Sequence, residues 1–344
     1  MKTNVLRSPG ESSSRLWRHA LTTRIGIITA TLFFSVVASG NEKPVYGSDD
    51  RQEWDRADAH ICEAGRATAA IVPKHQLERD QSDRWLLNSD RTLVDSNWCE
   101  DERFSDQPDL AICSAFLINE STLVTAAHCI NSMDDPEGPA YNCSDIAIVF
   151  DYAMMDDGEI RHRYRNSQIY HCKGIIAYRY IRGATDWAAI ELDRPTDRSS
   201  LALYTGDLAT IDDNPLEVVG HPLGLPLKWI RNGRIDFEKS ADSAQSDNVF
   251  TAAIDTFEGN SGSPVLVRNG NRPVVVGILS SGARDYTLGD RQCLSARACA
   301  NGECGGEQVT RANQFVHLSA IQPQAELAAE AQTSSRQNSQ AACL

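Results

Sequence analysis

Short apolar runs separated by polar turns fill the middle of this 344-residue chain. No long amphipathic period appears before the C-terminal end, so the runs favour β-strands over helices. The runs that we expect to form strands are 115–118, 122–125, 146–150, 175–178, 188–192, 216–219, 249–254, 265–267 and 274–279, and 67–72 is a candidate first strand. Many short strands with polar turns between them predict an all-β barrel or sandwich.

The two ends of the chain differ from this middle part. Residues 319–332 predict a short C-terminal helix, with Pro323 near its first turn, and the Ser/Gln/Ala-rich residues 333–344 are expected to fray apart from Cys343.

The N-terminal end has the pattern of an export signal. A basic flank of Arg15, Arg18 and Arg24 precedes an apolar run at 25–37, which is too short for a comfortable membrane span. Small residues at 38–40 offer a cleavage site. We therefore predict a secreted or periplasmic protein with no stable membrane insertion after cleavage, and an uncleaved anchor is the alternative.

The chain has ten cysteines, an even number. After an export signal this count is typical of a disulfide framework in an oxidising compartment. Our first guess at a pairing is Cys62 with Cys99, around a polar loop at 74–109. Zinc is the alternative for Cys293, Cys299 and Cys304, but this cluster contains no Cys-x-x-Cys pair and no histidine.

The net charge of -14 argues against a nucleic-acid partner.

Two acidic turns, 134–137 and 156–159, could bind calcium, although solvated turns are the simpler interpretation. We expect no metal and no cofactor.

A glycine-flanked serine stands at Gly259-Asn260-Ser261-Gly262, followed by Ser263-Pro264. A serine hydroxyl becomes a nucleophile only with a base and with a site for the oxyanion that it creates. The glycine before the serine allows the backbone to turn so that the N–H groups of Gly259 and Ser261 converge on one oxygen. The structural alternative is a turn between two strands.

A base for this serine is offered by His128, in the sequence Thr125-Ala126-Ala127-His128-Cys129. The small alanines allow close packing at the end of a strand, and a disulfide at Cys129 would fix the turn that carries the imidazole. Cys113, across the predicted hairpin, is its natural partner. Rigid placement matters because proton transfer depends first on hydrogen-bond geometry.

A carboxylate to orient the imidazole is offered by Asp186, at the start of the apolar run 187–192. It would be partly buried there, and a lone buried carboxylate is unfavourable without a partner. The other acidic residues nearby, Asp193 and Asp197, lie beyond the run.

These motifs occur in the order His, Asp, Ser, and together they resemble the trypsin/chymotrypsin-like serine peptidases. The Gly-Asn-Ser-Gly-Ser-Pro form resembles the secreted bacterial branch that includes the glutamyl endopeptidases. The resemblance covers roughly residues 111–320. It implies two six-stranded antiparallel β-barrels with the active site in the cleft between them. The chain would then divide into a signal peptide (1–40), a leader and loop-rich extension (41–110), a first barrel with His and Asp (111–200), a second barrel with Ser (201–322) and a tail (323–344).

The resemblance also implies the roles of individual residues. His128 would be the general base, Asp186 its orienting partner and Ser261 the nucleophile, with Gly259 and Ser261 supplying the oxyanion N–H groups. Ser280, Ser281 and Gly282 resemble the end of the strand that pairs with the substrate backbone, and Ser280 would approach the carboxylate of Asp186.

The chain departs from the family at two positions. Asn260 stands where zymogen-type digestive enzymes have the aspartate that pairs with a freed N-terminal amine, so that ion pair is not expected. Leu279 stands where the glutamyl branch has a histidine, which disfavours glutamate specificity.

Two further residues have a functional and a structural interpretation. Asp255 has the spacing at which trypsin-like enzymes place the carboxylate of the primary specificity pocket, which would favour substrate Arg or Lys. The alternative is that Asp255 pairs with backbone groups in its own loop. His221, in Gly220-His221-Pro222, is interpreted as part of a turn-rich loop rather than as a catalytic residue.

The sequence therefore predicts an exported serine endopeptidase that acts on peptides or proteins through an acyl-enzyme. The alternative from another class is a non-catalytic binding protein on the same scaffold, although such proteins usually lose a member of the triad and all three are present here.

Overall fold

The computed structural model describes residues 43–82, 84–88, 90–130, 141–155, 157–241, 247–282, 286–299 and 304–319, together with Cys343. The expected export signal, the C-terminal helix beyond residue 319 and the acidic turn at 134–137 lie outside these residues. Within them, the structure has no helix of the length and apolarity needed to span a membrane.

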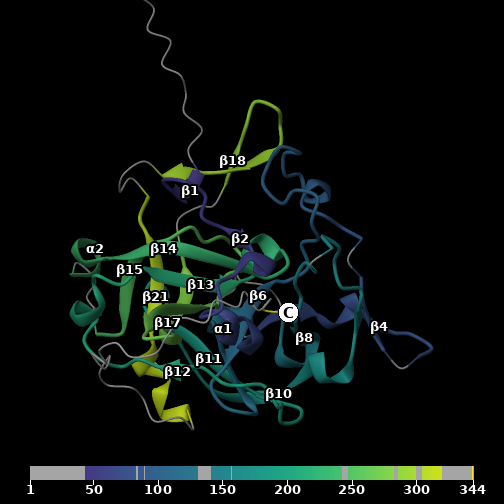
Figure 1. The fold of residues 1–344 in the computed structure, drawn as a ribbon, viewed down its shortest axis with the longest axis horizontal. Helices are drawn as coiled ribbons and strands as arrows, with labels where there is room; N and C mark the ends of the chain where they lie inside the picture. Colours follow the sequence, from purple (N-terminus) through teal and green to yellow (C-terminus); the bar gives the residue numbers. More distant parts are fainter. Residues whose placement is uncertain are drawn as a thin grey trace, which may run out of the picture. The chain divides into compact units, whose positions relative to one another are not determined.

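Six antiparallel strands close a first barrel (Figure 1). In their order around the barrel they are β10 (Ile169–Tyr180), β11 (Asp186–Leu192), β7 (Thr122–Thr125), β6 (Cys113–Leu117), β3 (Thr68–Pro73) and β8 (Ile146–Phe150). Every residue of β3, β6, β7 and β8 is buried. This explains why these strands appear in the sequence as short continuous apolar runs rather than as alternating ones.

A second six-stranded antiparallel barrel, drawn in green and yellow in Figure 1, follows the first. Its strands, in order around the barrel, are β17 (Arg272–Ser281), β16 (Pro264–Asn269), β13 (Leu216–Gly220), β14 (Lys228–Asp236), β15 (Val249–Ala253) and β21 (Glu307–Arg311), and pairing of β21 with β17 closes it. Two short strands extend this sheet: β12 (Ala202–Leu203) pairs with β17, and β2 (Gln52–Glu53) pairs with β14.

The hydrophobic core joins the two barrels. One cluster of buried residues fills the first barrel and continues into the second through Val219, Leu266 and Ile278. A second cluster, which includes Val218, Phe250 and Val276, fills the second barrel. The shared cluster fixes the first barrel against the second. The candidate catalytic residues meet at the junction of the two barrels.

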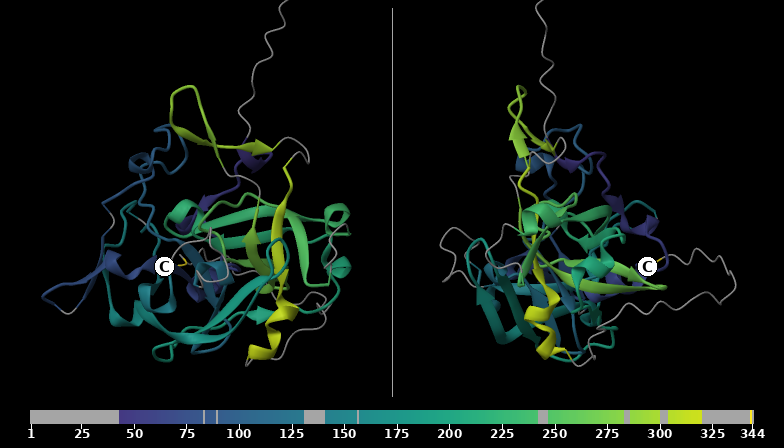
Figure 2. Two further views of the ribbon diagram at one scale, coloured as in Figure 1. Left: turned by 180° about the vertical axis from the view of Figure 1, so that it is seen from behind. Right: turned by 90° about the vertical axis from the view of Figure 1, so that its left-hand side faces the viewer.

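The remaining elements lie outside the two barrels, and Figure 2 shows them from two further sides. They are the strand pairs β1 (Lys43–Tyr46) with β20 (Ala298–Cys299) and β18 (Tyr286–Leu288) with β19 (Leu294–Ala296), the three-stranded sheet of β4 (Leu77–Arg79), β5 (Trp85–Leu87) and β9 (Arg163–Tyr164), and the helices α1 (Cys62–Ala67) and α2 (Phe237–Ala241).

The structure confirms the predicted all-β fold with two barrels, and each predicted run coincides with a strand. The first barrel begins earlier than the expected boundary at residue 111, because Thr68–Pro73 pairs with both β6 and β8. The sequence did not reveal β14 and β21, since charged and polar residues interrupt both, as in Glu307-Gln308-Val309-Thr310-Arg311.

All ten cysteines form disulfides, which pair Cys62 with Cys343, Cys99 with Cys293, Cys113 with Cys129, Cys143 with Cys172 and Cys299 with Cys304. The predicted pair of Cys113 and Cys129 is confirmed. The guess of Cys62 with Cys99 is wrong: both cysteines pair with residues more than 190 positions away, a connectivity that spacing along the chain does not encode.

A tight contact between Gly65 and the buried ring of Trp54 yields a stability prediction. A Cβ atom on Gly65 would lie 2.0 Å from Cζ2 of Trp54, so Gly65→Ala forces the helix and the indole apart. We expect the free energy of unfolding to fall by roughly 1–3 kcal/mol in urea titrations. Gly174→Ala is the matched control, because nothing lies within 4 Å of its added Cβ atom. Equal stability of the two variants would contradict this account of the packing.

Candidate active site

The loop between β15 and β16 carries Ser261, and two glycines with positive φ shape it. Gly259 has φ of 89° and Gly262 has φ of 85°, a region in which other residues are strained. A Cβ atom on Gly259 would lie 2.4 Å from the carbonyl oxygen of His221, and one on Gly262 would lie 2.2 Å from that of Ser114. Gly259 is therefore required for the close approach of the loop to the segment after β13, and Gly262 for its close approach to β6 of the first barrel.

Ser114 of β6 holds this loop in place from the first barrel. Its N–H donates to the carbonyl oxygen of Ser261 at 2.9 Å, and its hydroxyl donates to that of Gly259 at 3.0 Å. The same hydroxyl accepts the N–H of His221 at 3.0 Å. One buried serine thus joins three segments of the chain.

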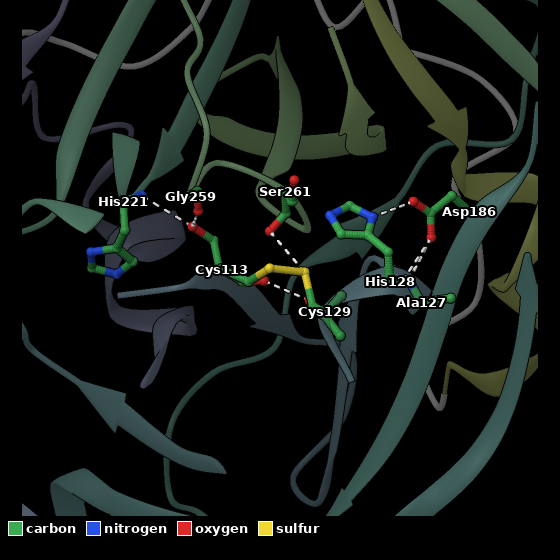
Figure 3. Close-up of a disulfide and its surroundings, with 10 residues drawn as sticks. Cys113, Ala127, His128, Cys129, Asp186, His221, Gly259 and Ser261 are labelled. Atoms are coloured by element: carbon green, nitrogen blue, oxygen red, sulfur yellow. Dashed lines mark hydrogen bonds and ion pairs between the residues drawn. A yellow bond between two sulfur atoms is a disulfide. The ribbon is translucent and has the colours of Figure 1, made fainter. Parts of the chain in front are cut away.

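His128 lies in the short 3-10 helix Ala127–Cys129 that follows β7. The disulfide between Cys113 and Cys129 ties this turn to β6 (Figure 3). Ala126 and Ala127 are buried, so the backbone of the turn packs directly on the core. The structure therefore places the imidazole on a rigid support, as the sequence predicts.

The carboxylate of Asp186, at the start of β11, faces His128. Its Oδ2 lies 2.5 Å from Nδ1 of His128, while its Oδ1 accepts the N–H of Ala127 at 2.6 Å and that of His128 at 3.2 Å. The backbone N–H of Asp186 donates to the hydroxyl of Thr310 at 3.1 Å. Both carboxylate oxygens are thus used to hold the imidazole and its turn.

Ser261 lies on the other side of the imidazole from Asp186 in Figure 3. His128 and Ser261 line two cavities together, of about 560 Å³ and 430 Å³. The lining of both cavities comes from the first barrel and from the second. The three candidate triad residues therefore meet at a cleft between the barrels.

The peptide between Glu258 and Gly259 is oriented by a contact with the loop after β13. The carbonyl oxygen of Glu258 accepts the N–H of Leu223 at 2.5 Å. In a trans peptide the carbonyl and the next N–H point in opposite directions, so the N–H of Gly259 points away from Leu223. The role of this N–H as an oxyanion donor stays a prediction, and the orientation of the peptide is compatible with it.

The predicted substrate strand is the end of β17. Ser280 and Ser281 line the smaller cavity together with His128 and Ser261. The hydroxyl of Ser280 donates to the carbonyl oxygen of Gln308 at 3.0 Å. Ser280 and Asp186 line the same cavity, and the expected approach of Ser280 to the carboxylate of Asp186 stays a prediction. Gly282 follows directly, and a Cβ atom there would lie 1.9 Å from the carboxylate of Glu307.

Asp255 lies away from both of these cavities as the described residues define them. It is 2% exposed, and its carboxylate accepts the backbone N–H of Tyr46 at 2.7 Å and that of Asp50 at 2.8 Å. Burial raises the pKa of Asp255 to about 6. These contacts favour the structural interpretation of Asp255. That interpretation expected backbone partners in its own loop, whereas the partners in the structure belong to a distant N-terminal segment.

Several cleft residues are not among those predicted from the sequence. The larger cavity is lined in part by Trp98 and Asp109 of the extension and by Tyr286 and Leu294 of the β18–β19 hairpin. They carry no recognisable motif, since distant parts of the chain bring them together. Glu307 is a further buried carboxylate that the sequence did not single out, and it accepts the hydroxyl of Thr256 at 2.8 Å.

One group with metal-ligand spacing occurs among the described residues, formed by Cys113, His128 and Cys129. Because the two sulfurs form a disulfide, they are not available as thiolate ligands. The cysteines suggested as a zinc cluster are likewise disulfide-bonded, Cys293 to Cys99 and Cys299 to Cys304.

Residues 113–278 match the family model described as the trypsin-like peptidase domain. The matched range contains His128, Asp186 and Ser261. No curated protein matches this chain.

His221 is buried beside the site, and its contacts favour the predicted structural interpretation. Its Nδ1 donates to the carbonyl oxygen of Leu225 at 3.0 Å, and its ring stacks on Tyr152 with centroids 5.5 Å apart. Burial lowers the pKa of His221 to about 3.

This buried histidine predicts an acid-sensitive stability. Between pH 6.5 and 3 the unfolded chain binds a proton at His221 that the folded protein excludes. The free energy of unfolding should therefore fall as the pH decreases through this range, by up to about 1.4 kcal/mol per pH unit. Urea titrations of the protein and of His221→Gln between pH 7 and 4 measure this effect, and an unchanged slope in the variant would contradict it.

Proposed function

Since the chain carries the trypsin-like peptidase domain of the trypsin/chymotrypsin-like serine peptidases, we propose that it is an exported serine endopeptidase with the triad His128, Asp186 and Ser261. The observation that carries the proposal is the 2.5 Å contact of His128 Nδ1 with Asp186, with Ser261 across the imidazole in the same cleft. Nothing in this mechanism calls for a cofactor.

The chemistry follows from this arrangement. The hydroxyl oxygen of Ser261 attacks the carbonyl carbon of a peptide bond, and Nε2 of His128 takes the hydroxyl proton and gives it to the leaving amine. Asp186 holds the imidazole in the Nδ1–H tautomer and stabilises its protonated form. The N–H groups of Gly259 and Ser261 stabilise the oxyanion. Water then hydrolyses the acyl-enzyme by the same steps.

An extended substrate is expected to add as a strand beside Ser280–Gly282. Backbone hydrogen bonds from such a strand supply affinity regardless of sequence, while pockets for alternate side chains supply specificity. The cavity lined by Trp98, Tyr286 and Leu294 offers apolar surface on one side of Ser261. The substrates are therefore peptides or unfolded segments of proteins.

A preference for Arg or Lys stays a prediction, and the contacts of Asp255 weigh against it. A carboxylate that accepts two backbone N–H groups has fewer lone pairs to offer to a substrate cation. The relation to the glutamyl endopeptidases also stays a prediction.

Export is supported by the five disulfides, which form and persist in oxidising compartments. The rival proposal, a non-catalytic binding protein on this scaffold, has less support because no member of the triad is replaced and all three lie at one cleft.

Cleavage-site profiling of a mixed peptide library by mass spectrometry tests the proposal. We expect cuts with the wild-type chain and a loss of at least about 10³-fold in turnover with Ser261→Ala and with His128→Ala, because each removes a group that makes or breaks bonds. Both variants should keep the circular dichroism spectrum of the wild type. Full activity in either folded variant would refute the triad.

A further inference from the structure

A segment far from Ser261 in sequence, Tyr46–Arg51, lies against the base of the loop that carries it. The two carboxylate oxygens of Asp255 accept the backbone N–H groups of Tyr46 and Asp50, at 2.7 and 2.8 Å. Asn232 of β14 fixes Asp50 further, by donating to its carboxylate at 2.9 Å. Asp255 is thus the point at which this segment and the loop are joined.

Arg51 makes a second connection to the same loop. Its side chain is fully buried, and its guanidinium lies 4.1 Å from the ring centroid of Phe257. Asp49 pairs with this guanidinium at 2.7 Å, and Glu102 lies 3.4 Å away. An arginine without solvent access is rare unless it is paired. The pairing of Arg51 with Asp49 and Glu102 is therefore part of how the fold accommodates this buried charge.

The segment has a firm anchorage of its own. The guanidinium of Arg103 donates to the carbonyl oxygens of Asp49 at 2.8 Å and Arg51 at 2.6 Å. Directly after Arg51, strand β2 pairs with β14, and Glu53 meets the buried Lys228 at 3.0 Å. The segment therefore provides a fixed support for the loop.

Only a few residues of the loop separate Asp255 and Phe257, which contact the segment Tyr46–Arg51, from Gly259 and Ser261. The N–H of Asn260 donates to the carbonyl oxygen of Phe257 at 2.9 Å, which closes a turn containing Gly259 immediately before Ser261. Ser114 and Leu223 hold the far end of this turn. Asp255 and Phe257 hold its near end, so the loop is fixed at both ends.

We propose that Asp255 and Arg51 are positioning residues, and that the segment Tyr46–Arg51 sets the conformation in which the N–H groups of Gly259 and Ser261 face one point. The catalytic consequence rests on the proposed function. The support itself is a property of the fold and is measurable without turnover.

This role differs in its kinetics from a role in the specificity pocket. A carboxylate that binds the substrate side chain affects only substrates with Arg or Lys. A positioning residue affects transition-state stabilisation for every substrate, and it lowers kcat more than it raises KM. A small displacement of catalytic groups reduces the rate by up to about 10²-fold.

The first experiment compares Asp255→Asn with the wild type on basic and non-basic peptides. The asparagine keeps one acceptor oxygen but turns an NH2 group toward one of the two backbone N–H groups. We expect kcat to fall about 10- to 100-fold on both classes, with KM changed less than about threefold. A loss confined to Arg and Lys substrates would overturn the proposal in favour of a pocket role.

The matched control is Asp151→Asn, a carboxylate that accepts from Arg198 at 2.6 Å and from Gln168 at 2.7 Å on the first barrel. It should lose stability without a change in kcat, which separates positioning from general destabilisation.

The second experiment uses Arg51→Lys and hydrogen exchange measured by mass spectrometry. This measurement tests the support of the loop even if the protein cleaves no substrate. Lysine keeps the charge but loses the planar group stacked on Phe257. Amides of residues 256–262 should exchange faster in Arg51→Lys and in Asp255→Asn than in the wild type and Asp151→Asn. Unchanged exchange at 256–262 in both folded variants would overturn the proposal. Faster exchange combined with an inactive wild type would refute the proposed function alone.

Discussion

The docking of the loop of Ser261 onto the first barrel is the constraint on which the site depends. Each barrel supplies part of the proposed triad, so the proposed catalysis requires a fixed distance between the two barrels. Ser114 sets it by donating to the carbonyl oxygens of Gly259 and Ser261 while accepting from His221. Because these groups are buried, leaving any of them unpaired would be unfavourable by roughly 1–3 kcal/mol. Glycine at 262 allows the backbone of the loop to come this close to β6, and glycine at 259 allows the same approach to the segment after β13.

Most of the fold could be predicted from the sequence, and the residues of the proposed triad could be singled out there, because both have local signals. Strands buried on both faces produce short apolar runs. The turn at Asn119–Ser121 is recognisable from its asparagine, whose Oδ1 accepts the N–H of Ser121. His128 is set off by the alanines and the cysteine beside it. Asp186 is distinguished from the other acidic residues by its place at the start of an apolar strand. In the structure both oxygens of its carboxylate make hydrogen bonds.

What the sequence could not reveal depends on contacts between distant parts of the chain. Cys62 pairs with Cys343, Asp255 pairs with Tyr46 and Asp50, and Trp98 meets Tyr286 at the cleft. No spacing rule links residues that are some two hundred positions apart. Asp255 shows the limit clearly: its position relative to Ser261 suggests a specificity pocket, whereas its hydrogen bonds serve the N-terminal segment.

The central claim, that the cleft activates Ser261 as a nucleophile, is tested most directly by covalent labelling. The folded protein is treated with a fluorophosphonate, digested and mapped by mass spectrometry. We expect one adduct, on Ser261, because this hydroxyl lies beside His128 at the cleft and is the proposed nucleophile. An adduct spread over several serines, or a folded protein in which Ser261 stays unmodified, would contradict it.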